Sequence, residues 1–224
     1  MKREIIKTAD GSSTIYLPEW NEHYHSKHGA LQEARHVFIK MGLDHWLEKS
    51  GSTSVSILEI GFGTGLNALI SMLEARQRKL TLEYTGVEAY PVSHEEVAAL
   101  NYVTAFSQKE ASEFFELLHQ ARWNARERLT DFFSLEKQQK FFNEIDALAA
   151  YDLIYFDAFG PRVQPELWSE EIFRSMFSAL KENGVLVTYS AKGSVRRAMQ
   201  AVGFQVERLP GPPGKREMLR ATRS

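Results

Sequence analysis

The chain has no cysteine among its 224 residues. Disulfides, thiolate nucleophiles and cysteine-ligated metal sites are therefore excluded. No apolar run approaches the roughly eighteen residues of a membrane span, and the opening "MKREIIKTADGSS" has none of signal-peptide length. The formal net charge is −2, which provides no global attraction for nucleic acid, so any RNA contact would need a local basic patch. These absences predict a cytoplasmic protein without a membrane segment.

Apolar residues are plentiful, at 43% of the chain, and can fill one sizeable core. Residues 1–50 are predicted to form an N-terminal strand, a His-rich loop and a helix that packs on the remainder. Residues 51–224 are predicted to form the main domain, and the two parts a single globular unit.

Strands and helices alternate from about residue 54 onward. The strands are expected at "VSILEI", "LEYTGVEA", "FFSLEKQQK", "YDLIYFDAF" and "GVLVTYS". Residues 110–130 read as mostly helical, and "SEEIFRSMFSAL" as a helix that begins at Ser169 and ends at Asn183-Gly184. The final segments, "FQVERLP" and "REMLRAT", resemble a hairpin. The pattern predicts an α/β fold with a parallel sheet, helices on both faces and an antiparallel strand at the edge.

Three glycines follow the first of these strands, at Gly61, Gly63 and Gly65. The dinucleotide fingerprint G-x-G-x-x-G/A would need glycine or alanine where Leu66 stands, which weakens an NAD or FAD reading. A phosphate-binding P-loop needs a Lys-Ser/Thr pair that is missing. A loop that approaches S-adenosylmethionine (SAM) remains, with a tight turn that binds nothing as the alternative.

Acidic residues end the neighbouring strands. Glu88 follows the glycines by about twenty residues, where a carboxylate can accept hydrogen bonds from ribose hydroxyls. Glu59 precedes the loop and could reach the cationic amino group of SAM, directly or through water. A solvated carboxylate is the alternative for Glu88.

The segment "YFDAFGPRVQPELW" places Asp157 after a strongly apolar strand and just before an aromatic residue and a proline. Because ligands bind beyond the carboxyl ends of parallel strands, Asp157 should face the same crevice as the glycines. A carboxylate can accept a proton from nitrogen, and Phe159 and Pro161 can wall a pocket for a base. The pattern suits methyl transfer to an amine, and an N-cap role for Asp157 is the alternative.

Several longer segments together resemble one family. They are "DGSSTIY", "EHYHSKHGALQEARHVFI", "LEIGFGTGLNAL", "VEAYP", "DLIYFDAFGPRVQPELW" and "LVTYSAKGSVRRAMQAVGFQVERLPGPPGKREMLRA". The chain resembles the methyltransferase domain of the bacterial MnmC enzymes and its free-standing MnmD versions. The resemblance implies a class I SAM-dependent methyltransferase fold, a Rossmann-like sheet of seven mostly parallel strands with the last one antiparallel.

The activity implied by the resemblance is conversion of 5-aminomethyl-2-thiouridine to 5-methylaminomethyl-2-thiouridine at the tRNA wobble position. Asp157 would be catalytic. The cofactor-binding residues would be Tyr24, Glu59, Gly61, Phe62, Gly63, Thr64, Gly65, Asn67, Glu88, Ala89 and Asp157. The substrate-binding residues would be Phe159, Pro161, Trp168, Lys192, Arg196, Arg197, Lys215 and Arg216.

The basic members of that set are the candidate tRNA contacts, and solvated surface positions are their alternative. In two-domain members of the family, an FAD-dependent oxidoreductase domain prepares the amine. Without a second glycine fingerprint in this chain, that activity is expected to be absent or supplied by a separate protein.

His23, His25 and His28 have irregular spacing and no H-E-x-x-H pattern, so no metal site is predicted. The family suggests instead that Tyr24, His25 and Ser26 fold over the cofactor as a lid. The family often has an acidic adenine contact after its third strand, where this chain has Gln139, Lys140 and Phe141.

Other functions remain as alternatives. A SAM-binding module that partners an oxidoreductase would not need Asp157 and Phe159 together, and a SAM enzyme acting on a small-molecule or protein amine would share the glycine loop. An NAD-dependent reductase would need a Tyr-x-x-x-Lys pair, which is missing.

Overall fold

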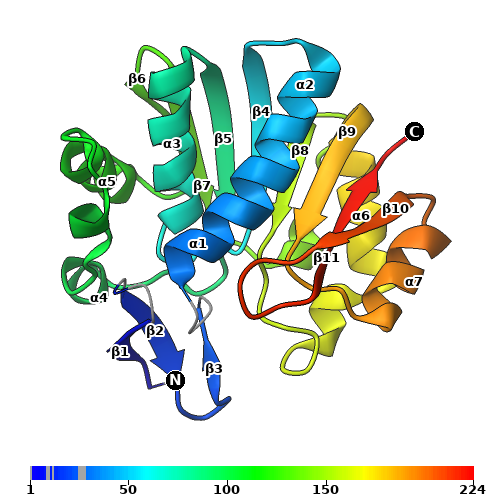
Figure 1. Ribbon diagram of the computed structural model, residues 1–224, viewed down its shortest axis with the longest axis horizontal. Coiled ribbons are helices and arrows are strands. Elements are labelled where there is room, and N and C mark those ends of the chain that lie inside the picture. Colours follow the sequence, from blue (N-terminus) through cyan, green and yellow to red (C-terminus); the bar gives the residue numbers. More distant parts are fainter. Residues whose placement is uncertain (1, 9–10, 12, 25–28) are drawn as a thin grey trace.

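An eight-stranded mixed sheet runs through the centre of the structure (Figure 1). The computed structural model describes residues 2–8, 11, 13–24 and 29–224. The strands follow one another across the sheet in the order β10 (Gln205–Pro210), β11 (Glu217–Thr222), β9 (Leu180–Thr188), β8 (Tyr151–Phe156), β4 (Ser54–Ile60), β5 (Thr81–Val87), β7 (Phe133–Gln138) and β6 (Ala125–Thr130).

The five strands from β9 to β7 are parallel, and β11 and β6 run antiparallel to their neighbours. Along β4, Val55 and Ile57 join the core on one face of the sheet, whereas Leu58 and Ile60 join the core on the other. A strand buried on both faces needs a continuous apolar run, which explains the composition of β4 and β8. The predicted fold class is confirmed, and β6 adds an eighth strand.

Helices cover both faces of the sheet (Figure 1). The first face carries α1 (Ala30–Ala34), the π-helical η1 (Arg35–Asp44), α2 (His45–Ser50), α3 (Leu66–Arg78) and α5 (Ala111–Gln120). The second face carries η3 (Phe142–Glu144), α6 (Glu170–Ala179) and α7 (Gly193–Ala201). Three short helices lie in loops: α4 (His94–Ala98), η2 (Tyr102–Ala105) and η4 (Pro165–Trp168).

A second, three-stranded antiparallel sheet precedes the long helix formed by α1, η1 and α2. Its strands are β1 (Glu4–Lys7), β2 (Ser13–Leu17) and β3 (Glu22–His23). Ile15 and Leu17 belong to the same buried cluster as the long helix and the first face of the main sheet. Arg3 ties this small sheet to α4 through Glu96 Oε2 at 2.9 Å, and to the segment before α4 through the Tyr90 carbonyl at 2.7 Å.

The expectation of mostly helix over residues 110–130 is wrong for its second half. The helix α5 ends at Gln120, and the chain then turns at Asn124, whose φ is 59°, to form β6. β6 pairs antiparallel with β7, so its helix-compatible residues are drawn into a strand by that pairing. β3 likewise lies in a segment expected to be a loop.

Two expectations near the C-terminus also need correction. The helix α6 is capped by Ser169 as predicted, but it ends at Ala179, and Asn183-Gly184 lies within β9. Asn183 N donates to the Arg223 carbonyl, and the Gly184 carbonyl accepts from Arg223 N. These bonds hold the part of β9 in which its register with β8 shifts. The antiparallel strand β11 lies between β9 and β10 rather than at the edge, because β10 pairs along its outer side.

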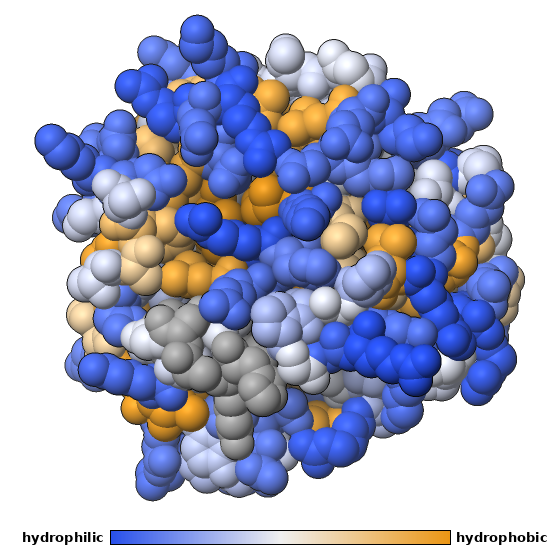
Figure 2. Space-filling view, viewed as in Figure 1, coloured by the Kyte–Doolittle hydropathy of each residue, from blue (hydrophilic) through white to orange (hydrophobic). Residues whose placement is uncertain are grey.

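Across the described residues, no helix combines the length and the apolar composition needed to cross a bilayer. Polar residues cover most of the face seen in Figure 2, with hydrophobic residues in separate patches between them. Four large hydrophobic side chains are exposed among the described residues: Ile5, Tyr90, Phe141 and Leu148.

Candidate active site

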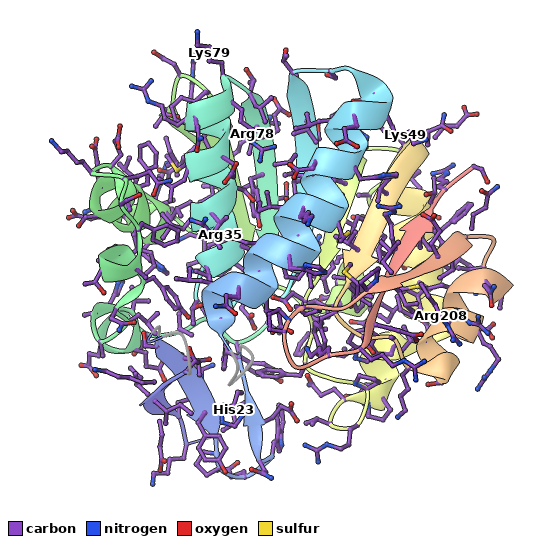
Figure 3. The ribbon with its side chains drawn as sticks, in the orientation of Figure 1. His23, Arg35, Lys49, Arg78, Lys79 and Arg208 are labelled. Carbon is purple, nitrogen blue, oxygen red and sulfur yellow. The ribbon has the colours of Figure 1, made fainter. Side chains whose placement is uncertain are left out.

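A cavity of about 1270 Å³ opens at the carboxyl ends of the central strands. The strand order reverses between β4 and β8, which is the position where open parallel sheets bind ligands. The loops after β4, β5 and β8 line the cavity, together with β3, α1 and the loop between β10 and β11. In Figure 3, His23 on β3 lies at this end of the molecule, whereas Lys49 and Lys79 lie at the opposite end.

The glycine loop brings main chain to the cavity wall. Gly61 has a φ of 88°, and a Cβ there would lie 2.7 Å from the main-chain oxygen of Asp157. Gly63 has a φ of 51°, and a Cβ there would lie 3.2 Å from the ring of Tyr24. The left-handed conformation and the close approach together explain why glycine is required at both positions.

Glu88 is held by main-chain groups on both sides. Its Oε2 accepts a hydrogen bond from Gly63 N at 3.1 Å, and its Oε1 accepts one from Tyr90 N at 2.9 Å. Burial raises the pKa of this carboxyl, and these main-chain donors oppose the rise. Each oxygen retains a lone pair, so the oriented carboxylate can accept further hydrogen bonds from hydroxyl groups.

Glu59, Asn67 and Asp157 form a hydrogen-bonded chain at the cavity floor. Asn67 Nδ2 donates to Glu59 Oε1 and to Asp157 Oδ2, both at 2.9 Å. The hydroxyl of Tyr84 donates to Glu59 Oε2 at 2.9 Å. Both oxygens of Glu59 therefore have a donor, whereas the buried Asn67 Oδ1 has no hydrogen-bond partner within the described residues. A buried acceptor left without a partner is costly, which points to a donor supplied by a ligand.

Asp157 follows β8, and its main-chain N bonds to the Ile60 carbonyl at 2.9 Å, which fixes it beside the glycine loop. Burial raises the pKa of its carboxyl to about 7, and the charge of Glu33 adds to the rise. Asn67 and Lys215 act in the opposite direction. A carboxyl with a pKa near neutrality can both accept and release a proton under physiological conditions.

The loop after Asp157 is held by two side chains beneath it. The indole Nε1 of Trp168 donates to the Phe159 carbonyl, and the hydroxyl of Tyr189 donates to the Ala158 carbonyl, both at 2.8 Å. Phe159 makes edge contacts with Trp20 at 5.6 Å and with Tyr24 at 5.0 Å between ring centroids. The result is an aromatic wall of Trp20 and Tyr24, on either side of β3, and Phe159, from the loop after β8.

Most of the predicted site residues meet at this cavity. Those that line it are Tyr24, Glu59, Gly61, Phe62, Gly63, Asn67, Glu88, Ala89, Asp157, Phe159 and Lys215. Lys215 is turned inward and pairs with Glu33 on α1. Their roles as ligand contacts stay predictions.

The remaining predicted residues lie outside the cavity lining. Thr64 and Gly65 are buried beneath the loop, where Thr64 Oγ1 bonds to the Tyr102 hydroxyl at 2.9 Å. Trp168 is buried as well and supports Phe159 rather than presenting its own surface. The other residues of this group are Pro161, Lys192, Arg196, Arg197 and Arg216.

Several residues at the cavity were not predicted from the sequence: Arg3, Trp20, Glu33, Tyr90, Phe142, Asn143 and Tyr189. Tyr90 and Phe141 are 61% and 54% exposed and meet edge to face at 5.9 Å. Exposed aromatic rings at a cavity mouth are the signal that would have identified this pair, but exposure is not visible in a sequence.

Of the expected lid of Tyr24, His25 and Ser26, the last two residues lie outside the described residues, as does His28 of the histidine group. Tyr24 and His23 do line the cavity. Within the described parts of the chain, no cluster of three or more His, Asp or Glu side chains has the arrangement of a metal site.

Comparison with known families decides among ligands for this site. A family model described as S-adenosyl-L-methionine-dependent methyltransferase matches residues 95–224, more than half of the chain. The chain belongs to this family. Its cofactor is SAM. The lining fits a cationic ligand, because Asn67 Oδ1 has no donor among the described residues and Glu59, Glu88 and Asp157 contribute carboxyl groups to the cavity.

Curated relatives match nearly the whole chain. A tRNA 5-methylaminomethyl-2-thiouridine biosynthesis bifunctional protein MnmC from Cupriavidus metallidurans is 31% identical over 96% of this chain. The MnmC protein from Azoarcus sp. is 33% identical over 92% of it. The chain spans about a third of the length of these relatives, 33% and 34%.

Solved structures with a similar fold include a related MnmC-type protein and a spermidine synthase. MNMC2 from Aquifex aeolicus matches the whole chain with a TM-score of 0.81 and 25% identity, and the match covers 70% of that protein. A spermidine synthase from Thermotoga maritima matches 99% of the chain with a TM-score of 0.56 at 15% identity, over 72% of its own length. The second match concerns the fold alone.

Proposed function

We propose that this chain transfers a methyl group from SAM to the primary amine of 5-aminomethyl-2-thiouridine at the tRNA wobble position. Family membership supports the methyl transfer, and the name of the curated relatives supports the product. The observation that carries the proposal is Asp157, a cavity carboxyl with a pKa near 7 that Asn67 holds in place.

The cofactor end of the cavity has matching groups for each part of SAM. Glu88 would accept hydrogen bonds from the ribose hydroxyls, and Asn67 Oδ1 would accept one from the ammonium group. Tyr90 and Phe141 would cover the adenine. This assignment replaces the acidic adenine contact of the family with aromatic contact, which suits a chain with Gln139, Lys140 and Phe141 in that segment.

When bound, SAM supplies a methyl group on a sulfonium. The chain's own task is to present a neutral amine about 3 Å from that methyl, opposite the sulfur. Asp157 accepts a hydrogen bond from the amine and takes its proton, so that a nitrogen lone pair becomes free. Asn67 keeps the carboxylate in one orientation by donating to Oδ2.

The acceptor base would be extruded from the anticodon loop and lie against the aromatic wall. Phe159, Trp20 and Tyr24 form that wall, and Trp168 and Tyr189 hold its main chain in place. Stacking on aromatic rings is the usual way in which proteins bind single-stranded RNA bases.

The tRNA backbone would contact basic side chains at the same edge of the sheet. Lys192, Arg197 and Arg216 are exposed, and Arg196 is partly buried with an Nε that has no partner among the described residues. Methyl transfer to tRNA should therefore weaken as salt concentration rises. A separate FAD-dependent oxidoreductase that prepares the amine is a further part of the proposal.

The test is transfer of labelled methyl groups from SAM to tRNA taken from a strain that lacks this activity, followed by nucleoside mass spectrometry. A new 5-methylaminomethyl nucleoside at the wobble position is the expected result. The control is tRNA from the parent strain, in which this position is already methylated. SAM binding without transfer to tRNA would contradict the proposal and favour a small-molecule or protein amine as acceptor.

A further inference from the structure

An ion pair from two distant segments lines the cavity. We call the part lined by Glu33, Asp157, Tyr189 and Lys215 the acceptor end, because the amine would bind there. Lys215, in the loop between β10 and β11, donates from Nζ to Glu33 Oε1 on α1. Its Nζ also lies over the ring of Tyr189, 3.8 Å from the centroid. Glu33, Lys215 and Tyr189 all line the cavity, so the pair faces the space in which Asp157 lies.

The pair is more enclosed than a surface ion pair. The side chains of Lys215 and Glu33 are 32% and 11% exposed, whereas Arg126 and Glu83 on the main sheet are 56% and 52% exposed. An enclosed pair interacts with neighbouring charges through less water, so its field on other cavity groups is screened less.

Asp157 is surrounded by ionisable groups from several elements. In the described residues these are Glu59 on β4, Tyr84 on β5, Tyr189 after β9, Glu33 on α1 and Lys215 in the β10–β11 loop. Glu59 and Tyr84 bond to each other, and the Tyr189 hydroxyl bonds to the Ala158 carbonyl. Glu33 and Lys215 are therefore the two groups of opposite charge that act on Asp157 from the acceptor side.

We propose that Glu33 and Lys215 are positioning residues that set the charge of the acceptor end, so that Asp157 takes a proton from the incoming amine. The inference rests on the proposed function. Glu33 favours proton uptake by Asp157, and Lys215 limits that uptake so that the carboxyl is ionised when the amine arrives. The two charges balance each other across one contact.

The proton balance of the step is complete. An ammonium group on the acceptor gives one proton to the Asp157 carboxylate and becomes a neutral amine. Its lone pair forms the new N–C bond as the S–C bond of the cofactor breaks, which leaves a neutral thioether and a protonated secondary amine. Asp157 then releases its proton to solvent, and the product leaves with its own.

The experiment measures kcat/KM for the aminomethyl tRNA against pH, with SAM saturating. The acidic limb of this profile reports the carboxyl that must be ionised. Lys215→Met removes the positive charge, so the limb should move to higher pH by about one unit. Glu33→Gln removes the negative charge, so the limb should move to lower pH by about one unit.

Three further variants complete the design. The double variant E33Q/K215M leaves no unpaired charge and should return the limb toward that of the wild type. Lys215→Arg keeps the charge and should keep the limb. Lys49→Met, at the far end of α2 (Figure 3), is the matched control and should change neither the limb nor the rate.

Opposite shifts in the two single variants, with the SAM dissociation constant unchanged, support the inference. If both variants lower kcat/KM equally at every pH, the pair is a structural tie between α1 and the hairpin loop, and the inference is overturned. A higher KM for tRNA in Lys215→Met without a shift would also overturn it, since that result indicates a phosphate contact. Wild-type protein that methylates no tRNA amine would instead refute the proposed function.

Discussion

The Asp157 carboxyl lines the cavity and has a pKa near 7. The proposed methyl transfer depends on this carboxyl to accept the proton of the amine. Asp157→Asn keeps the size of the side chain but removes the proton acceptor. We expect kcat for tRNA methylation to fall by about 10²-fold or more, because proton transfer by a positioned group contributes on that scale. Single-turnover methylation measures the loss, and calorimetry should show SAM affinity within a few-fold of the wild type.

The matched control is Asp131→Asn, because Asp131 is fully exposed in the turn between β6 and β7. This variant should methylate at the wild-type rate. An active Asp157→Asn protein would show that proton transfer does not depend on this carboxyl.

Some site residues could be predicted because they end strands. Glu88 and Asp157 follow apolar runs, and parallel strands bring their carboxyl ends to one edge, so the sequence sufficed to bring both into one cavity. Lys215 was expected to contact phosphate from a flexible turn. It turns inward because Glu33 and the ring of Tyr189, far away in sequence, provide its partners.

At the scale of elements, the loop between β4 and α3 limits what the cavity tolerates. Gly61→Ala adds a Cβ that would lie 2.7 Å from the Asp157 carbonyl, in a conformation that side chains rarely adopt. The loop must move away from β8, so we expect SAM affinity to fall by about tenfold or more, equal to about 1.4 kcal/mol. Calorimetric titration with SAM measures this change.

Gly51→Ala provides the control, because Gly51 also has a positive φ, at 66°, but among the described residues beyond its two chain neighbours no atom lies within 4 Å of the added Cβ. It should lower the free energy of unfolding by about 1 kcal/mol and leave SAM affinity unchanged. Equal SAM affinity in the two variants would contradict the prediction, because it would show that the close approach of the added Cβ to Asp157 does not displace the loop from the cofactor site.

Strands that are apolar on both faces could be predicted from the sequence. Strands that form, or take their place in the sheet, because a neighbouring strand pairs with them could not. β4 and β8 follow continuous apolar runs. β6, with the sequence "ARERLT", alternates only weakly and becomes a strand because β7 offers an edge. The position of β11 inside the sheet depends on β10 pairing with it, which periodicity alone does not specify.

At the scale of the whole molecule, Arg3 connects the small sheet to the main body. Its guanidinium bonds to Glu96 and to the carbonyls of Tyr90 and Pro91, and it lies 5.8 Å from the ring centroid of Tyr24. Arg3→Met should loosen the small sheet at a cost of about 1–3 kcal/mol, because charge-assisted hydrogen bonds are lost. Hydrogen exchange should become faster in β1 and β2.

Arg126→Met is the control, since Arg126 forms a highly exposed ion pair with Glu83. Pairs of this kind contribute about 0–1 kcal/mol. Exchange in β1 and β2 that stays the same in Arg3→Met would mean that burial of Ile15 and Leu17 alone fixes the small sheet.

The ion pair between Glu33 and Lys215 affects when the cavity is completed during synthesis of the chain. Residues from the first and last parts of the chain complete the same cavity wall, 182 positions apart. A ribosome adds residues from the N-terminus onward, so this part of the wall is incomplete until the β10–β11 hairpin has emerged. A nascent chain that already holds its glycine loop and Asp157 therefore still lacks Lys215, and the cavity acquires its full set of charges only after the loop between β10 and β11 has been synthesised.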